Sequence, residues 1–194
     1  MRFEINNVNV YGIAQSIKAS GYPMQTEIDT TLSMQDFDRG KMLAKTKAGS
    51  GHDCFLKGVT VQVDVTAPQY WWLQFGRYHF ADIVSSQSKM HRITKMKIDK
   101  QVNDYVDQRI IEVLKELIKT YGVSKHKVVK KYHFQRIISS CPMGLMLTAR
   151  ITTNYLQLKS IYNQRRSHKL EEWQEFCNWI ESLPFSEWIT GQTE

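Results

Sequence analysis

Valine alternates with polar residues between positions 59 and 65 (VTVQVDV), and this pattern limits the fold more than any other feature of the chain. A period of two with β-branched residues on one face indicates a strand with one buried side. Pro68 follows, and proline suits the first turn of a helix because its missing N–H needs no partner there. Residues 70–75 then carry four aromatic rings. We therefore expect a buried strand followed by a helix that packs on the core.

The first third of the chain contains both strand patterns and helix patterns. Residues 2–12 alternate enough to predict a strand, and a short helix is expected at residues 13–19. Ser33 and Asp36 have the Ser-x-x-Asp spacing of a helix start, with an acidic group near the positive end of the helix dipole. This spacing predicts a helix that runs to about residue 47.

Helical spacing dominates the second half of the chain. Residues 102–121 place apolar side chains three and four positions apart, and Gly122 is expected to end that helix. Residues 145–165 and 168–182 are predicted as two more helices, with Ser167 as a cap. No repeat or linker divides the chain, so we expect residues 1–194 to form a single α+β domain.

Composition and charge exclude several classes of protein. The 42% hydrophobic content is enough for a core, and the longest apolar runs are far shorter than the roughly 20 residues that span a bilayer. The N-terminus has no signal-peptide core, and three scattered cysteines without CxxC spacing argue against disulfides. We therefore expect a cytoplasmic protein without a membrane segment. The histidines have no zinc-site spacing, so no metal is expected.

The net charge of +7 favours anionic partners such as a phosphorylated metabolite, a dinucleotide cofactor or nucleic acid. A solvated basic surface explains the charge equally well. Neither a Gly-x-Gly-x-x-Gly nor a Walker-type loop is present, so a phosphate site would need Arg side chains, which grip phosphate oxygens in pairs. Three places suit this purpose: residues 77–92, Arg136, and the pair Arg165 and Arg166. Each could also be an ordinary basic surface.

Several of these segments, in order and at their spacing, resemble the flavin-dependent thymidylate synthases. Residues 51–58 (GHDCFLKG) are similar to the family's Gly-His-Glu-Ser/Thr-x-x-Glu-His segment. Residues 65–68 (VTAP) follow, and residues 74–79 (QFGRYH) cover the position of the family's signature Arg-His-Arg. The first two segments lead into and out of the predicted valine strand, as they do in the family.

The C-terminal part extends the resemblance. Asn154 opens a helix that reaches Arg165 eleven residues later, as in the family's Asn-x-Arg-Ser-Leu…Arg helix. Residues 172–175 (EWQE) are similar to the family's Ala-Gln-Trp-Glu. Together the matches span residues 50–180. The resemblance implies a central, largely antiparallel sheet flanked by helices.

The resemblance also implies an enzyme: an FAD-dependent methyltransferase that converts dUMP to dTMP with methylenetetrahydrofolate and NADPH. It implies a homotetramer as well. A cation near the uracil ring would stabilise the charge that develops during transfer to its carbon 5. Reduced flavin supplies the hydride, and no enzyme cysteine attacks the base, so scattered cysteines are no objection.

Site residues follow from the matching positions. The implied catalytic residues are Arg165 and Ser88. The implied substrate-binding residues are Gln74, Arg77, Ser86, Gln87, Ser88, Arg136 and Arg165. The implied cofactor-binding residues are His52, Cys54, Arg77, Tyr78, His79, Asn154 and Ser160.

The chain departs from the family pattern at signature positions. Tyr78 and His79 stand in place of the His and the second Arg of Arg-His-Arg, and Lys57 and Gly58 replace an upstream Glu and His. These changes leave an alternative open: a non-catalytic or altered-specificity relative that binds a nucleotide or nucleic acid. The basic stretch at residues 125–131 is consistent with that alternative.

Overall fold

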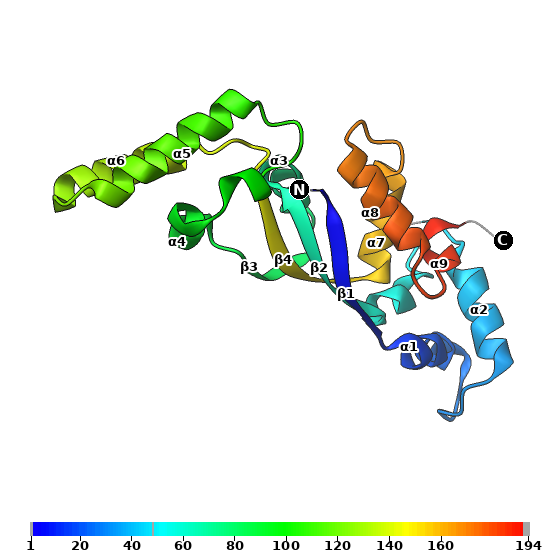
Figure 1. Ribbon diagram of the computed structural model, residues 1–194. Coiled ribbons are helices and arrows are strands. Elements are labelled where there is room, and N and C mark those ends of the chain that lie inside the picture. Colours follow the sequence, from blue (N-terminus) through cyan, green and yellow to red (C-terminus); the bar gives the residue numbers. More distant parts are fainter. Residues whose placement is uncertain (1, 48, 192–194) are drawn as a thin grey trace. The chain divides into compact units, whose positions relative to one another are not determined.

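The computed structural model describes residues 2–47 and 49–191 and shows an α+β fold. Four strands form one antiparallel sheet in the order β1 (Glu4–Tyr11), β2 (Thr60–Pro68), β4 (Met146–Asn154) and β3 (Asp82–Ser86). The predicted fold class, an α+β chain with an antiparallel sheet and flanking helices, is confirmed. Figure 1 shows these elements with their labels.

The chain divides into two compact units, which we call unit 1 and unit 2. Unit 1 comprises Met1–Glu4, Val65–Arg77 and Ile83–Arg150, and unit 2 comprises Ile5–Asp64, Tyr78–Asp82 and Ile151–Glu194. All four strands pass from one unit into the other. The expectation of a single domain stays a prediction.

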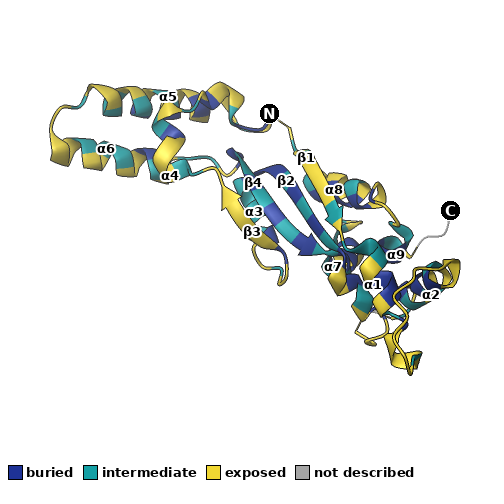
Figure 2. Ribbon diagram, turned by 90° about the horizontal axis from the view of Figure 1, so that it is seen from below, coloured by how far each residue is buried: buried dark blue, intermediate teal, exposed yellow. Residues whose placement is uncertain are grey.

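The predicted valine strand is β2, one of the two central strands of the sheet. Val61, Val63 and Val65 are fully buried, as the alternation predicts, while Gln62 and Asp64 are only partly buried. The strand runs on to Pro68, which is the N-cap residue of α3 (Gln69–Phe75) and does not lie within its first turn as expected. The outer strand β3 is exposed along its length (Figure 2).

Unit 1 contains a helical hairpin. Its helices α5 (Gln108–Val123) and α6 (Lys127–Ser139) lie side by side in both ribbon views (Figures 1 and 2). A buried cluster that includes Leu114 and Ile137 holds them together. The remaining elements of this unit are short: α4 (Lys89–Arg92), η3 (Ile93–Lys95) and η4 (Ile98–Lys100).

The helices predicted at residues 145–165 and 102–121 have a different extent in the structure. Residues 145–165 do not form one helix, because the first part is strand β4 and only α7 (Tyr155–Arg165) is helical. The predicted helix at residues 102–121 starts later, at α5, and continues through Gly122. Val102 instead pairs with Leu145 in an isolated antiparallel bridge. Tertiary pairing overrides the helical spacing in both places.

Unit 2 packs its helices around α7. Ile161 of α7 and Trp173 of α8 (Glu171–Glu181) are both fully buried. The predicted helix at residues 168–182 begins later than expected, with Leu170 rather than Ser167 at its N-cap. The other elements of unit 2 are α1 (Ile13–Ala19), η1 (Tyr22–Met24), α2 (Met34–Ala44), η2 (Cys54–Gly58), α8 (Glu171–Glu181) and α9 (Glu187–Thr190).

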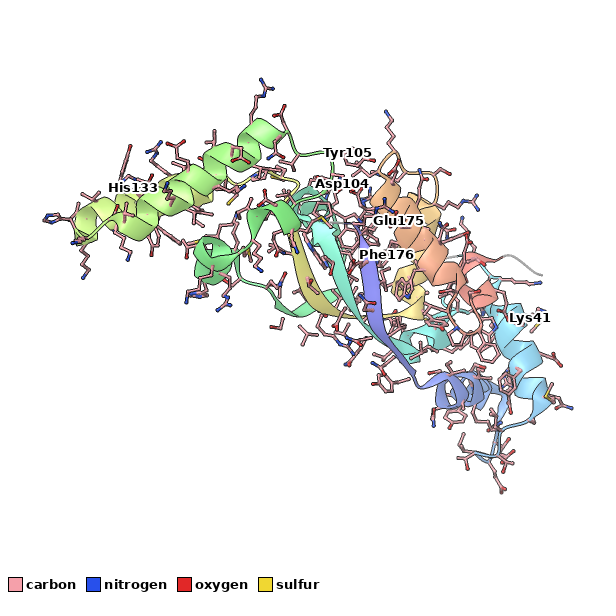
Figure 3. All side chains as sticks on the ribbon, viewed as in Figure 1. Lys41, Asp104, Tyr105, His133, Glu175 and Phe176 are labelled. Atoms are coloured by element: carbon pink, nitrogen blue, oxygen red, sulfur yellow. The ribbon has the colours of Figure 1, made fainter. Side chains whose placement is uncertain are left out.

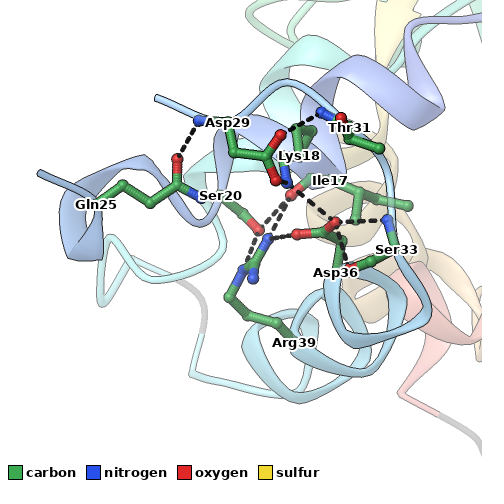
Figure 4. Close-up of polar contacts among 9 residues, drawn as sticks. All are labelled: Ile17, Lys18, Ser20, Gln25, Asp29, Thr31, Ser33, Asp36 and Arg39. Atoms are coloured by element: carbon green, nitrogen blue, oxygen red, sulfur yellow. Dashed lines mark hydrogen bonds and ion pairs between the residues drawn. The ribbon is translucent and has the colours of Figure 1, made fainter. Parts of the chain in front are cut away.

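A buried polar network joins α1 to α2 (Figure 4). Asp36 accepts hydrogen bonds from Arg39, from Lys18 and from the backbone N–H of Ser33, which completes the predicted capping box. Lys18 also contacts Asp29, at 3.3 Å. Hydrogen bonds from Arg39 and Ser33 hold the pKa of Asp36 well below its usual range, so this carboxylate stays ionised where it is buried.

Candidate functional site

Helix α7 carries three of the residues predicted from sequence. Asn154 is its N-cap, and the Asn154 side chain accepts a hydrogen bond of 2.9 Å from the Gln157 backbone N–H. This bond satisfies one of the donors that every helix start leaves open. Ser160 and Arg165 follow on the same helix, which Leu158 anchors in the core. The cap fixes where the helix begins and therefore where Ser160 and Arg165 lie.

Arg165 is held by two aromatic residues at the end of α7. Its Nε donates a hydrogen bond of 2.6 Å to the hydroxyl of Tyr78. Its guanidinium carbon lies 4.6 Å from the ring centre of Trp173 and 5.6 Å from that of Tyr78. A cation over an indole face is attracted by the ring's negative potential. Two predicted site residues, Arg165 and Tyr78, therefore meet directly.

Hydrogen bonds extend from Tyr78 back along the helix. The Tyr78 hydroxyl donates to Gln164 Oε1 at 3.2 Å, and Gln164 Nε2 donates to Ser160 Oγ at 3.3 Å. This chain connects three predicted residues, with Gln164 as a link that the sequence reasoning missed. His79 follows Tyr78 in the chain and is exposed.

His168 lies beside the same aromatic group, with its ring centre 6.3 Å from that of Trp173. Its Nδ1 accepts a hydrogen bond of 3.1 Å from the Leu170 backbone N–H. Burial lowers the pKa of His168, and the positive charges of Arg165 and Lys169 lower it further. The imidazole is therefore held in its neutral form near neutral pH.

A buried ion pair fixes the segment that contains His52 and Cys54. Asp53, between them, accepts a 2.7 Å hydrogen bond from Lys159, and the two side chains are 2% and 8% exposed. Lys159 also donates to two backbone carbonyl oxygens, those of Ala44 and Thr46. His52 and Cys54 themselves are exposed. Sequence reasoning selected the neighbours of this pair but not the pair.

Unit 1 contains a cavity of about 430 Å³ whose lining is mostly apolar. Ser86, at the end of β3, is the one predicted residue that lines it. Such a volume lies in the range of ligand sites, about 300–1,000 Å³. Sequence reasoning assigned the aromatic residues of α3 to the core and so missed this cavity. Its lining consists of Gln69, Trp72, Leu73, Ile83, Ser86, Met143, Leu147 and Ala149.

Polar groups surround Gln69, which lines the cavity. Its Oε1 accepts a 2.9 Å hydrogen bond from Lys89, and its Nε2 donates to the carbonyl of Pro142 at 3.1 Å. Gln87 exchanges two hydrogen bonds with the backbone of Thr148, at 2.9 and 3.0 Å. These bonds extend the pairing of β3 with β4 by one residue.

The remaining predicted residues of unit 1 lie at helix ends or on helix surfaces. Ser88 caps α4 by accepting from the His91 backbone N–H at 3.3 Å. Gln74 is partly buried on α3, and Arg77 is exposed just beyond that helix. Arg136 is exposed on α6, with its guanidinium 5.9 Å from the ring centre of Tyr132.

The predicted residues therefore fall into two sets. One set lies on unit 2 and consists of His52, Cys54, Tyr78, His79, Asn154, Ser160 and Arg165. All but Arg165 of the predicted substrate-binding residues belong to unit 1. The predicted cofactor-binding residues, except Arg77, belong to unit 2.

Comparison with solved structures gives matches over the whole chain. Two crystal structures of the flavin-dependent thymidylate synthase ThyX from Helicobacter pylori, both with FAD and dUMP, match 98% of this chain and 97% of theirs. Their TM-scores are 0.66 and 0.68, at 11% sequence identity. The UMP/dUMP methylase PolB from Streptomyces cacaoi, bound with 5-Br dUMP, matches 93% of this chain and 89% of its own, with a TM-score of 0.66 and 12% identity.

The chain has the fold of the flavin-dependent thymidylate synthases. No protein-family model matches the sequence, and no curated protein matches it either. The likeness therefore rests on the path of the chain. At this identity it establishes the thymidylate synthase-like fold, while activity depends on individual residues.

One departure from the thymidylate synthase pattern lies where α1 comes close to η2. Gly58 stands where the family's upstream segment has His, and a Cβ at this position would clash with Ser16 Oγ of α1. Gly12, with a positive φ of 80°, is also close, since a Cβ there would clash with the Gly58 carbonyl oxygen. Gly12 is therefore required at its position, whereas the contact at Gly58 is with the end of a side chain that can rotate.

Within the described residues, no helix is long and apolar enough to cross a membrane. The same residues contain no group of three or more His, Cys, Asp or Glu side chains placed to hold a metal ion.

Proposed function

We propose that this protein is an FAD-dependent enzyme that methylates a uridine nucleotide reductively, converting dUMP to dTMP with methylenetetrahydrofolate and NADPH. The observation that carries the proposal is the end-to-end thymidylate synthase-like fold together with an oriented Arg165 at the end of α7. The proteins that share this fold are described as a thymidylate synthase and a UMP/dUMP methylase.

In this proposal Arg165 acts on the uracil ring. Transfer to carbon 5 moves electron density onto the ring, and a fixed cation beside its carbonyl edge lowers the energy of that state. The hydrogen bond to Tyr78 and the stacking on Trp173 restrict the orientation of the guanidinium before substrate binds. A preoriented charge needs little rearrangement during reaction, so we assign Arg165 the catalytic role and Tyr78 a positioning role.

Unit 1 contains predicted substrate-binding residues of its own. The cavity next to Ser86 is apolar enough for a flat ring, and it has Gln69 and Ser86 as polar groups. The charge and hydrogen-bonding groups that a nucleotide monophosphate needs are supplied by Arg77, Gln74, Gln87 and Ser88. Arg136 is the second exposed arginine that we propose for the phosphate.

The residues present fit a flavin in their chemistry. A flavin offers a large aromatic ring and a diphosphate, and the side chains proposed for it provide an aromatic ring, hydroxyl and amide groups, imidazoles and a cation. We propose that these are Tyr78, Ser160, Asn154, His52, His79, Cys54 and Arg77. When bound, reduced FAD supplies the hydride that completes the methyl group.

Cofactor binding can be tested directly with purified protein. We expect the visible absorption spectrum of a flavoprotein, or a rise in melting temperature when FAD is added, because a ligand that binds only the folded state stabilises it. FMN serves as the control ligand. Colourless protein whose melting temperature is unchanged by FAD would contradict the proposal.

A second candidate is a relative with altered specificity or without catalysis. It is favoured by Tyr78 and His79 in the signature, and by the likeness to PolB, which is described as acting on UMP as well as dUMP. Titration with UMP and dUMP separates the two candidates, since tighter binding of UMP would favour altered specificity.

A homotetramer, whose subunits would complete one another's flavin sites, is part of the main proposal. Light scattering at four times the 22.7-kDa chain mass would support it.

A further inference from the structure

Charge is divided unequally between the two units. By sequence, unit 1 contains 16 Lys and Arg against six Asp and Glu, whereas unit 2 contains ten against 13. The positive charge of the chain therefore belongs to unit 1. Binding a single nucleotide monophosphate does not require an excess of this size.

Within unit 1, four cations line one groove of about 430 Å³. They are Arg92, Lys95, Lys97 and Lys100, and two amide side chains, Gln87 and Gln101, lie with them. All four cations are exposed, and in the described part of the chain no acidic side chain forms an ion pair with any of them. Asp99 lies between two of these lysines in sequence, but it pairs with Lys115 of α5 at 3.1 Å. The groove therefore keeps its positive charge.

The groove has a packed base. Ile93 and Ile98 alternate with the cations and are buried in the same cluster as Leu114 of α5. Gln101 Nε2 donates a 2.7 Å hydrogen bond to the Met146 carbonyl, which ties the end of the segment to β4. Apolar residues thus point inward while the lysines remain outside. The segment that contains the cations is therefore held in place by buried residues and a hydrogen bond to β4.

Helix α6 of the same unit adds basic and aromatic groups. Tyr132 is 62% exposed, and Arg136, one turn later, lies 5.9 Å from its ring centre. Lys127 and Lys131 are exposed on this helix, and Figure 2 shows exposed residues along much of it. His133 on α6 is labelled in Figure 3. Exposed aromatic rings among cations form surfaces on which unpaired bases stack.

We infer that unit 1 binds single-stranded nucleic acid through its phosphate backbone, with the groove of Arg92, Lys95, Lys97 and Lys100 as the main contact. Four cations exceed what one monophosphate needs, while a strand presents one negative charge at every nucleotide. The groove volume is that of a site for a small ligand, about 300–1,000 Å³, so it admits part of a single strand rather than a duplex. This inference goes beyond the proposed catalysis and does not depend on it.

The test measures binding of a fluorescein-labelled oligothymidylate of about 20 nucleotides by fluorescence anisotropy, between about 50 and 200 mM salt. The variant is the triple substitution Lys95→Ala, Lys97→Ala and Lys100→Ala. The matched control removes three exposed lysines of unit 2: Lys41→Ala, Lys45→Ala and Lys47→Ala. Lys41 lies on α2 (Figure 3). All six lysines are exposed, and equal melting temperatures would show that both variants fold.

We expect the groove variant to bind at least about tenfold more weakly than the wild type, and the control within about twofold. Each phosphate contact on a single strand contributes about 0.7 to the slope of log K against log salt, so the slope should fall by about two in the groove variant only. Equal losses in both variants, or no binding at low salt, would overturn the inference. Equal affinity for tripolyphosphate would also overturn it, in favour of a small polyphosphate ligand. Colourless protein that still binds the oligonucleotide would defeat only the proposed function.

Discussion

Arg165 has its guanidinium fixed on two sides, by the Tyr78 hydroxyl at 2.6 Å and by the Trp173 ring at 4.6 Å. The order of motifs in the sequence is enough to predict Arg165 and Tyr78 as site residues. That they touch could not be predicted, because they are 87 positions apart in the sequence and only the fold brings them together. Trp173 and Gln164 were missed for the same reason.

Replacing Arg165 with Lys should weaken dUMP binding by about tenfold or more, because an ammonium cannot reproduce a planar donor pair, and a hydrogen bond to a charged group contributes about 1.5–3 kcal/mol. Isothermal titration calorimetry measures the change. Arg166→Lys, the exposed neighbour, is the control and should bind as the wild type does. Equal affinities of the two variants would remove Arg165 from the nucleotide site.

His168 should make stability depend on pH. Its pKa is lowered in the folded state, so the unfolded chain binds a proton more readily near the ordinary value of about 6.5. The stabilisation is therefore present above about pH 6.5 and is lost as the pH falls toward the lower folded value. Melting temperatures between about pH 5 and 8 should fall less steeply on acidification in His168→Asn than in the wild type. Parallel curves would contradict this prediction.

At the scale of elements, local pattern and tertiary pairing decide different parts of the fold. The valine strand and the capped start of α2 were predictable because alternation and capping are local properties. Strand β4 was predicted as helix, although Ile151 and Thr153 alternate inward as a strand requires. Its apolar residues also fit helical spacing, and pairing with β2 and β3 settled the conflict.

The cavity near Ser86 belongs to the same scale. Residues of α3, β3, β4 and the loop before β4 line it, so no single segment of sequence shows it. The lining residues are mostly apolar, and each one taken alone would be predicted to lie in the hydrophobic core. The polar residues were proposed for the site because a family pattern marks them by spacing.

The buried pair of Lys159 and Asp53 joins α7 to the η2 segment, and breaking it should destabilise unit 2. Lys159→Met leaves a buried carboxylate without its partner, which usually costs about 3–5 kcal/mol. Urea unfolding measures the loss. Lys57→Met, at an exposed lysine of the same segment, should change stability by about 0.5 kcal/mol at most.

Adding Asp53→Asn to Lys159→Met should restore part of the lost stability, since no unpaired charge then remains buried. If Lys159→Met unfolds at the same urea concentration as the control, the pair does not stabilise the fold.

At the scale of the whole molecule, the fold is shared from end to end with proteins that are only 11–12% identical in sequence. Core pattern and topology can persist at this level, because many apolar residues satisfy the same burial. Specific chemistry cannot be inferred in the same way, since it depends on a few side chains in fixed positions. Positive charge concentrated in unit 1 is a further property of the whole chain, independent of the fold match.

The most direct test of the proposed methylation is release of tritium from carbon 5 of labelled dUMP. With FAD, methylenetetrahydrofolate and NADPH present, the wild type should release tritium, and Arg165→Lys should release it far more slowly than Arg166→Lys. Omitting FAD from protein freed of flavin should stop the release. No release by the wild type from either dUMP or UMP, in protein shown to bind FAD, would contradict the account.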